Sequence, residues 1–151
     1  MEKSEKPFIL LVDDNEPTCT LMTALLQKDF AIDVASDGLE AIEKLKTNSY
    51  GAIILDLLMP QLDGYGVLDF LKEHNPNMLH RVLVVTASLT RNDIARVHSY
   101  NVCTLISKPF EVDTLLSAVR QCVEVTPSGR AAILSSGLIL LLSELLRTRL
   151  M

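Results

Sequence analysis

The sequence predicts an α/β domain built on a doubly wound, five-stranded parallel sheet. Short apolar runs alternate along the chain with stretches that carry the 3.6-residue apolar period of helices. The apolar runs contain few polar residues, as expected of strands that are covered on both faces. Strands that alternate with helices in this way form βαβ crossovers, so a three-layer fold is expected.

Each predicted strand is a short run rich in aliphatic residues. The first, FILLV, ends at Asp13 and Asp14, and the third, GAIIL, ends at Asp56. The fourth contains VLVVT and ends near Thr86, and the fifth, CTLIS, ends just before Lys108. The five predicted strands cover residues 8–12, 30–35, 51–55, 81–87 and 103–107.

The helices are predicted from apolar spacing and from the residues at their ends. Pro17 suits a first helical turn, and Leu39, Ile42 and Leu45 form one apolar stripe. Asn101 follows the fourth helix, and asparagine tolerates the left-handed conformation that a helix end needs. The five predicted helices cover residues 17–28, 37–48, 65–73, 91–100 and 112–124.

Composition is that of a soluble globular protein, with 48% hydrophobic and 22% charged residues and a formal net charge of -5. The acidic balance disfavours direct nucleic-acid binding. The charged N-terminus lacks the apolar core of a signal peptide, so a cytoplasmic location is expected. Cys19, Cys103 and Cys122 are widely separated and odd in number, and we expect separate buried thiols in a reducing compartment, not a zinc site.

A second region begins near the break at TPSGR. Residues 1–125 are predicted to form one domain, and residues 126–151 a linker and an amphipathic C-terminal helix. The longest apolar run of this tail, five residues, is too short for a membrane span of about 20 residues. Leucines with four-three-four spacing predict a helix that promotes a homodimer through residues 131–150, or that packs on its own domain.

Polar residues follow four of the predicted strands, and parallel strands present their carboxyl ends at one edge of a sheet, where ligands bind. Mutual repulsion among the three carboxylates favours a hard divalent cation, and Mg²⁺ accepts carboxylates, waters and phosphate oxygens. A threonine hydroxyl and a lysine suit a phosphoryl group. The set predicts phosphoryl transfer to a carboxylate. Its members are Asp13, Asp14, Asp56, Thr86 and Lys108.

The chain resembles the receiver domains of two-component response regulators over roughly residues 6–124. The motifs that carry the resemblance are VDDNE, LDLLMPQLDG, VVTAS and SKPF. The resemblance implies a flavodoxin-like strand order of 2-1-3-4-5, and a histidine kinase or phosphotransfer protein as phosphodonor. Such a domain catalyses only its own phosphorylation and dephosphorylation, so we do not expect a conventional enzyme.

The resemblance also assigns roles to the site residues. It implies that Asp56 is the phospho-acceptor and that Asp13, Asp14, Asp56 and the backbone carbonyl of Leu58 hold Mg²⁺. Thr86 and Lys108 would contact the phosphoryl group. The peptide bond that follows Lys108 is commonly cis in this family.

One position departs from the family pattern. Many receivers carry an aromatic residue three positions before the lysine, whereas this chain has Leu105. The usual movement of a ring is therefore replaced, and we expect switching to run through Thr86 and the backbone of the fourth helix and fifth strand, or through another ring such as Tyr100. Leu58 and Ser88 flank the path of attacking water and should influence the phosphoryl lifetime.

Other functions remain open at this point. A phosphatase with an aspartate nucleophile would need a second carboxylate two residues after it, and Asp56 is followed by Leu57 and Leu58. A receiver-like interaction module that acts without phosphorylation is an alternative. The chain is alternatively the receiver fragment of a larger multidomain regulator. No output domain fits in the 26 residues after the break.

Overall fold

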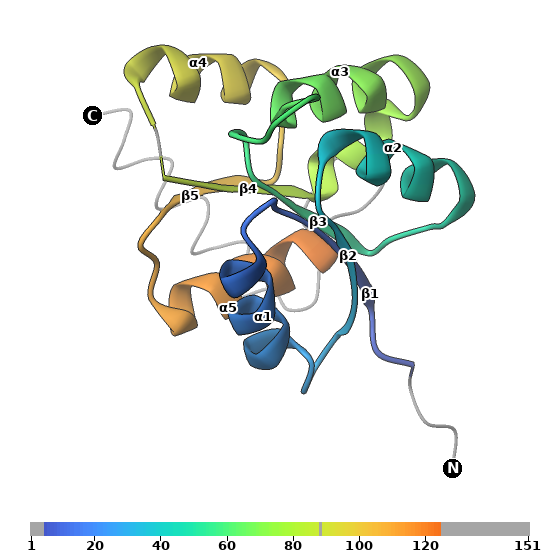
Figure 1. The fold of residues 1–151 in the computed structure, drawn as a ribbon, viewed down its shortest axis with the longest axis vertical. Coiled ribbons are helices and arrows are strands. Elements are labelled where there is room, and N and C mark those ends of the chain that lie inside the picture. Colours follow the sequence, from blue (N-terminus) through green and yellow to red (C-terminus); the bar gives the residue numbers. More distant parts are fainter. Residues whose placement is uncertain (1–4, 88, 125–151) are drawn as a thin grey trace, which may run out of the picture.

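The computed structural model describes residues 5–87 and 89–124. Five strands form one parallel sheet in the order β2-β1-β3-β4-β5, which confirms the doubly wound fold and its strand order (Figure 1). The strands are β1 (Phe8–Val12), β2 (Ala31–Ala35), β3 (Ala52–Leu55), β4 (Val82–Thr86) and β5 (Thr104–Ser107).

Helices cover both faces of the sheet. Figure 1 shows α1 and α5 on one face and α2, α3 and α4 on the other. The helices are α1 (Glu16–Leu26), α2 (Gly38–Thr47), α3 (Gly64–His74), α4 (Arg91–Ser99) and α5 (Val112–Val123). A 3-10 helix, η1 (Pro76–Arg81), leads into β4 and was not predicted.

Two hydrophobic clusters lie on opposite faces of the sheet. Leu10 and Val12 of β1 belong to the cluster beneath α2 and α3, whereas Ile9 and Leu11 belong to the cluster beneath α1 and α5. In register, Leu10 of β1 pairs with Ile53 of β3. All four residues of β3 are buried, as its unbroken apolar sequence predicts.

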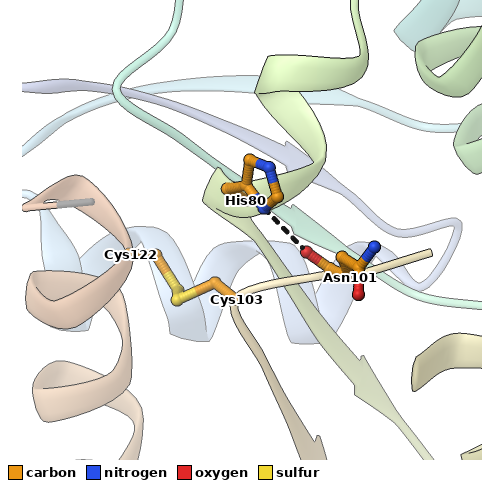
Figure 2. Close-up of a disulfide and its surroundings, with 4 residues drawn as sticks. All are labelled: His80, Asn101, Cys103 and Cys122. Carbon is orange, nitrogen blue, oxygen red and sulfur yellow. Dashed lines mark hydrogen bonds between the residues drawn. A yellow bond between two sulfur atoms is a disulfide. The ribbon is translucent and has the colours of Figure 1, made fainter. Parts of the chain in front are cut away.

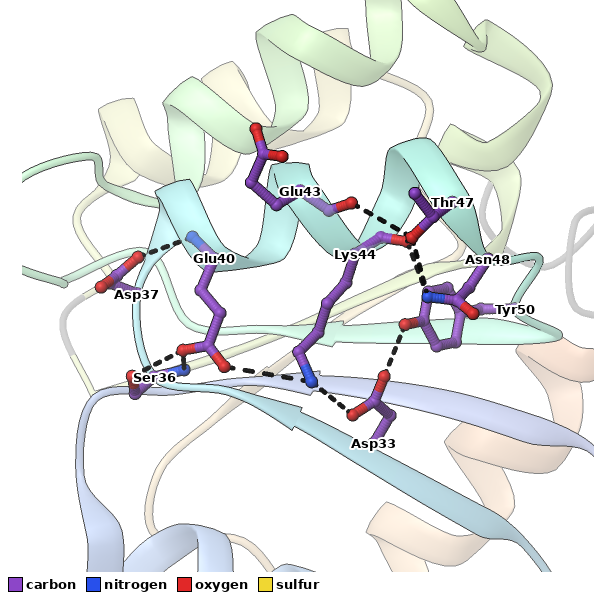
Figure 3. Close-up of polar contacts among 9 residues, drawn as sticks. All are labelled: Asp33, Ser36, Asp37, Glu40, Glu43, Lys44, Thr47, Asn48 and Tyr50. Carbon is purple, nitrogen blue, oxygen red and sulfur yellow. Dashed lines mark hydrogen bonds and ion pairs between the residues drawn. The ribbon is translucent and has the colours of Figure 1, made fainter.

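The edge strand β2 is only half buried, unlike the central strands. Its Asp33 accepts hydrogen bonds from the Lys44 ammonium (2.6 Å) and the Tyr50 hydroxyl (2.7 Å), as Figure 3 shows. Burial alone would raise the pKa of Asp33, but these two bonds hold it below its ordinary value. The network joins α2 to the sheet edge.

Two cysteines form a disulfide, contrary to the expectation of separate thiols. Cys103, directly before β5, is bonded to Cys122 of α5 across a Cα–Cα distance of 5.7 Å (Figure 2). Beside it, His80 Nδ1 lies 3.2 Å from the backbone oxygen of Asn101. The expectation was wrong because the fold brings two positions 19 residues apart within disulfide distance. Cys19 is a free thiol as expected, but it is only partly buried.

The predicted ends of the elements agree with the structure to within two residues. Asn101 has a φ of 58°, the left-handed conformation expected after α4. None of the helices in the described part of the chain has the length and apolarity needed to span a bilayer. The tail, residues 126–151, and its predicted helix lie outside the described residues.

Candidate functional site

The sheet topology brings the predicted site residues to one edge. Asp13 follows β1, Asp56 follows β3, Thr86 ends β4 and Lys108 follows β5. Backbone hydrogen bonds continue the sheet to these positions: Asp56 N–H donates to the Val12 carbonyl (3.0 Å) and Lys108 N–H to the Thr86 carbonyl (2.9 Å). The rigid sheet therefore fixes the spacing of the side chains.

A lysine bridges two buried carboxylates. Lys108 Nζ lies 2.8 Å from Asp13 Oδ2 and 3.3 Å from Asp56 Oδ2. Asp13 and Asp56 are only 3% and 8% exposed. Burial alone would lower the pKa of Lys108, but the hydrogen bond to Asp13 and the charges of Asp56 and Asp13 raise it above its ordinary value. Lys108 is thus held as a cation.

The remaining carboxylate oxygens are oriented by main-chain donors. Asn15 N–H donates to Asp13 Oδ1 (2.9 Å), and Leu58 N–H donates to Asp56 Oδ1 (3.2 Å). The Asn15 side chain also caps α1 by accepting from the Thr18 N–H. Hydrogen bonds from the backbone to carboxylates are charge-assisted and fix the rotamers of both aspartates.

The acidic cluster has the composition of a cation site. One ligand oxygen from each of Asp13, Asp14 and Asp56 lies within 4.8 Å of the others. The Asp14 side chain is exposed to solvent, whereas the carboxylates of Asp13 and Asp56 are buried. Lys108 neutralises only one of the three negative charges, so a hard divalent cation fits the charge that remains.

Thr86 places a hydroxyl at the same edge. Its side chain is fully buried, and Oγ1 has no hydrogen-bond partner among the described residues. An unsatisfied buried hydroxyl costs about 1–3 kcal/mol, so the site gains if an incoming oxygen accepts from it. Ser88, expected to flank the site, lies outside the described residues.

Close backbone packing holds the loop that follows Asp56. A side chain at Gly64 would place Cβ 2.4 Å from the carbonyl oxygen of Asp56, so only glycine fits there. Gly64 N–H donates to the Leu57 carbonyl (3.0 Å), which ties the start of α3 to the loop. Leu58, which lies in the loop between Leu57 and Gly64, has a side chain at the surface that is 58% exposed.

One expectation about the region around Lys108 is confirmed. The peptide bond from Lys108 to Pro109 is cis. Leu105, at the position where many receivers have an aromatic residue, is half-buried and packs against the cluster beneath α2 and α3. An aliphatic side chain thus takes part in the core on this side of β5.

Two contacts at the site were not expected from the sequence. The Cys19 thiol donates to the Asp13 carbonyl (3.3 Å), and burial together with the charge of Asp13 raises the pKa of Cys19 to about 11. The second is the cap formed by Asn15. The sequence does contain a signal for this cap, because asparagine is a preferred N-cap residue and Asn15 directly precedes Glu16 and Pro17 at the start of the helix.

Comparison with known proteins gives consistent matches. The family described as "Response regulator receiver domain" matches residues 9–120. The transcription factor prr1 of Schizosaccharomyces pombe is 31% identical over 117 residues, which are 77% of this chain and 21% of that protein. The chain spans about a fifth of the length of the first curated relatives that it matches.

Solved structures match the same region. The receiver domain of the Francisella response regulator 1452 has a TM-score of 0.72 and 27% identity, over 78% of this chain and 97% of that one. The receiver domain of sensor histidine kinase PA1611 from Pseudomonas aeruginosa PAO1 has a TM-score of 0.70 and 23% identity, over 78% and 98% of the two chains. That neighbour is described with a magnesium ion coordinated in its active site cleft.

Proposed function

The chain belongs to the response regulator receiver domain family, and we propose that it accepts a phosphoryl group on Asp56. Receiver domains are signalling modules that act with histidine kinases or phosphotransfer proteins. The donor in this proposal is a phosphohistidine of such a protein. The output is a change in partner binding or self-association, and the chain catalyses only its own phosphorylation and dephosphorylation.

One observation carries the proposal, namely the lysine that bridges two buried carboxylates. Lys108 lies 3.3 Å from Asp56 and 2.8 Å from Asp13, at the carboxyl edge of a parallel sheet. A purely structural ion pair needs one carboxylate, whereas this lysine faces two, with a third nearby. Excess negative charge at the carboxyl edge of a parallel sheet suits a site that binds a cation and a phosphoryl donor.

The transfer is a displacement at phosphorus. An Asp56 carboxylate oxygen forms a bond to phosphorus, while the P–N bond of the donor breaks and its electron pair stays on the imidazole nitrogen. Lys108 and Thr86 donate hydrogen bonds to phosphoryl oxygens and stabilise the charge on them. The buried hydroxyl of Thr86 gains its acceptor in this state.

Magnesium is the cofactor that suits the acidic cluster. In this proposal Asp13, Asp14, Asp56 and the backbone carbonyl of Leu58 hold the ion, which leaves positions for waters and a phosphoryl oxygen. When bound, Mg²⁺ supplies positive charge that offsets the repulsion between the phosphoryl group and the carboxylates. Asp14, exposed at the mouth, is the ligand that an entering ion meets first.

Phosphorylation switches the domain through Thr86 in this proposal. Its hydroxyl moves toward the phosphoryl group and draws the loop between β4 and α4 with it. Because Leu105 replaces the usual aromatic residue, no ring at that position reports the change. The state of Asp56 therefore reaches the surface through backbone shifts of α4 and β5.

The proposal extends to the organisation of the chain. Residues 1–125 form the receiver domain, and residues 126–151 form a linker and an amphipathic helix that promotes a homodimer through residues 131–150. We place the domain in the cytoplasm, where phosphohistidine donors and Mg²⁺ are available. Nucleic acid is not a direct partner of this acidic domain.

Acetyl phosphate, a small phosphodonor, tests the proposed function. Incubated with Mg²⁺, the wild-type chain should gain one phosphoryl group in intact mass, and hydroxylamine should remove it, as expected of an acyl phosphate. Asp56→Asn should gain none, while the exposed-residue control Asp29→Asn should label like wild type. Full labelling of the Asp56→Asn protein, or none of wild type, would refute the proposal.

A further inference from the structure

Helix α4 is held to the domain by few apolar contacts. It directly follows the loop after Thr86, and of its nine residues only Val97 is buried. Figure 1 shows α4 beside α3 on the same face of the sheet. A helix with one buried residue gains little from hydrophobic burial, so other contacts must fix its position.

A tyrosine of α3 binds the first turn of α4. The Tyr65 hydroxyl donates to Asp93 Oδ1 (2.6 Å), and the guanidinium carbon of Arg96 lies 3.7 Å from the centroid of the Tyr65 ring. Tyr65 is only 8% exposed. Burial, and next the hydrogen bond to Asp93, raise the pKa of Tyr65 to about 12, so the hydroxyl remains a donor.

The acceptor of that bond also builds the helix cap. Asp93 Oδ2 accepts from the N–H (3.1 Å) and the hydroxyl (2.7 Å) of Thr90, whose Oγ1 in turn accepts from the Asp93 N–H. This reciprocal capping box starts α4 four residues after Thr86. The Tyr65 hydroxyl thus contacts the group on which the start of α4 depends.

A second tyrosine holds the other end of α4. The Tyr100 hydroxyl donates to Asp69 Oδ1 of α3 (2.5 Å), and Tyr100 is also 8% exposed. Lys72 Nζ lies 5.8 Å from the Tyr100 ring. A tyrosine–carboxylate hydrogen bond therefore links α4 to α3 near each end of α4.

Tyr65 lies one residue from the point where α3 contacts the phospho-acceptor. The preceding residue, Gly64, packs so closely on the Asp56 carbonyl that a Cβ there would come within 2.4 Å. A shift of the loop after Asp56 would consequently reach Tyr65, because α3 begins at Gly64. The Tyr65–Asp93 bond would then pass the shift to α4.

We propose that the Tyr65–Asp93 hydrogen bond is a positioning contact that couples the phosphorylation state of Asp56 to α4. This coupling rests on the proposed function. It provides a route that bypasses Leu105 and acts in parallel with Thr86.

Amide exchange, measured on the full chain with and without Mg²⁺ and beryllium fluoride as phosphoryl mimic, tests the coupling. In Tyr65→Phe, the amides of Asp93 and Ile94, which donate to Thr90, should exchange about tenfold faster than in wild type without the mimic, because one charge-assisted bond is lost. The change that the mimic causes in α4 should fall to less than half of the wild-type change.

The matched control is Tyr50→Phe. It removes a similar hydroxyl–carboxylate bond, to Asp33 of β2 at the opposite edge of the sheet from β5, and should leave the α4 response at the wild-type size. Intact mass after acetyl phosphate treatment is measured in parallel, and Tyr65→Phe should still be labelled. If the mimic changes amide exchange of α4 as much in Tyr65→Phe as in wild type, the Tyr65–Asp93 bond only stabilises the structure, and the coupling is overturned. A wild-type chain without label or response would overturn the proposed function and the coupling with it.

Discussion

Lys108 and Asp13, 95 residues apart in the sequence, form an ion pair with an Nζ–Oδ2 distance of 2.8 Å. The pair joins the end of β1 to the end of β5, which are separated in the sheet by β3 and β4. Lys108 also reaches Asp56, which follows β3, from the same position. One cation thus pairs with the carboxylates that follow two strands, and the Asp14 carboxylate beside them is exposed.

Removal of Asp14 should weaken magnesium binding. Asp14→Asn retains the size of the side chain but removes one of three ligand charges, so the dissociation constant measured by calorimetry should rise about tenfold or more. Glu73→Gln, an exposed change near the end of α3 that lies away from Asp56, is the matched control and should bind like wild type. Equal affinities of Asp14→Asn and wild type would contradict the ligand set.

The Asp33 network should make stability depend on pH below about pH 4. The pKa of Asp33 is held below its ordinary value in the folded state, so its ion pair stabilises the fold above the unfolded pKa of about 3.9. That stabilisation is lost as the pH falls through the lower folded pKa. Because the Asp33 and Lys44 side chains are 23% and 28% exposed, it amounts to about 1 kcal/mol.

This effect can be measured by urea unfolding of wild type and Asp33→Asn at pH values from about 2.5 to about 7. The range lies on both sides of the unfolded-state aspartate pKa of about 3.9. The difference in unfolding free energy should be constant from about pH 5 upward and should shrink toward zero at lower pH. Asp29→Asn, which removes an exposed ion pair with Arg120, should differ little from wild type throughout. A difference for Asp33→Asn that grows on acidification would have the wrong sign.

Reduction of the disulfide should lower stability without loss of the fold. Cys103 and Cys122 close a loop with a sequence separation of 19, which constrains the unfolded chain by about 3 kcal/mol at 25 °C. Thermal unfolding of the air-oxidised chain, with and without reductant, should show this loss. The Cys103→Ser/Cys122→Ser variant should be insensitive to reductant, and the same sensitivity in that variant would exclude the disulfide as the cause.

Truncation after residue 125 should separate the receiver domain from the tail. The remaining chain keeps every described element and should fold and accept phosphate like the full chain. If the tail promotes a homodimer, light scattering should give a dimer mass for the full chain and a monomer mass for the truncated one. A full chain that is monomeric at high concentration would refute the dimer.

The sheet and the grouping of the site residues could be predicted from the sequence. Both depend on short sequence patterns, and the parallel arrangement of the strands then brings the residues that follow them together. Apolar runs located the strands, and the carboxyl ends of parallel strands share one edge, so Asp13, Asp56 and Lys108 were expected to meet. The strand order itself came from family resemblance, because apolar patterns specify which segments are strands but not which strands pair.

Contacts between side chains that are distant in the sequence could not be predicted in this way. The Tyr65–Asp93 bond joins residues 28 apart, and the Cys103–Cys122 bond depends on how α5 packs beside β5. Three cysteines allow three pairings, and spacing does not select one. Likewise, η1 has no apolar period and a proline start, so it reads as a turn.

The 95-residue separation of Lys108 and Asp13 also bears on synthesis of the protein. Asp13, Asp14 and Asp56 leave the ribosome well before Lys108, so a nascent chain carries the three carboxylates without the lysine that pairs with two of them. Only when β5 docks beside β4 does the counter-charge arrive, which makes the finished site a late event in folding. A chain that ends before Lys108 would therefore lack the cation that pairs with Asp13 and Asp56.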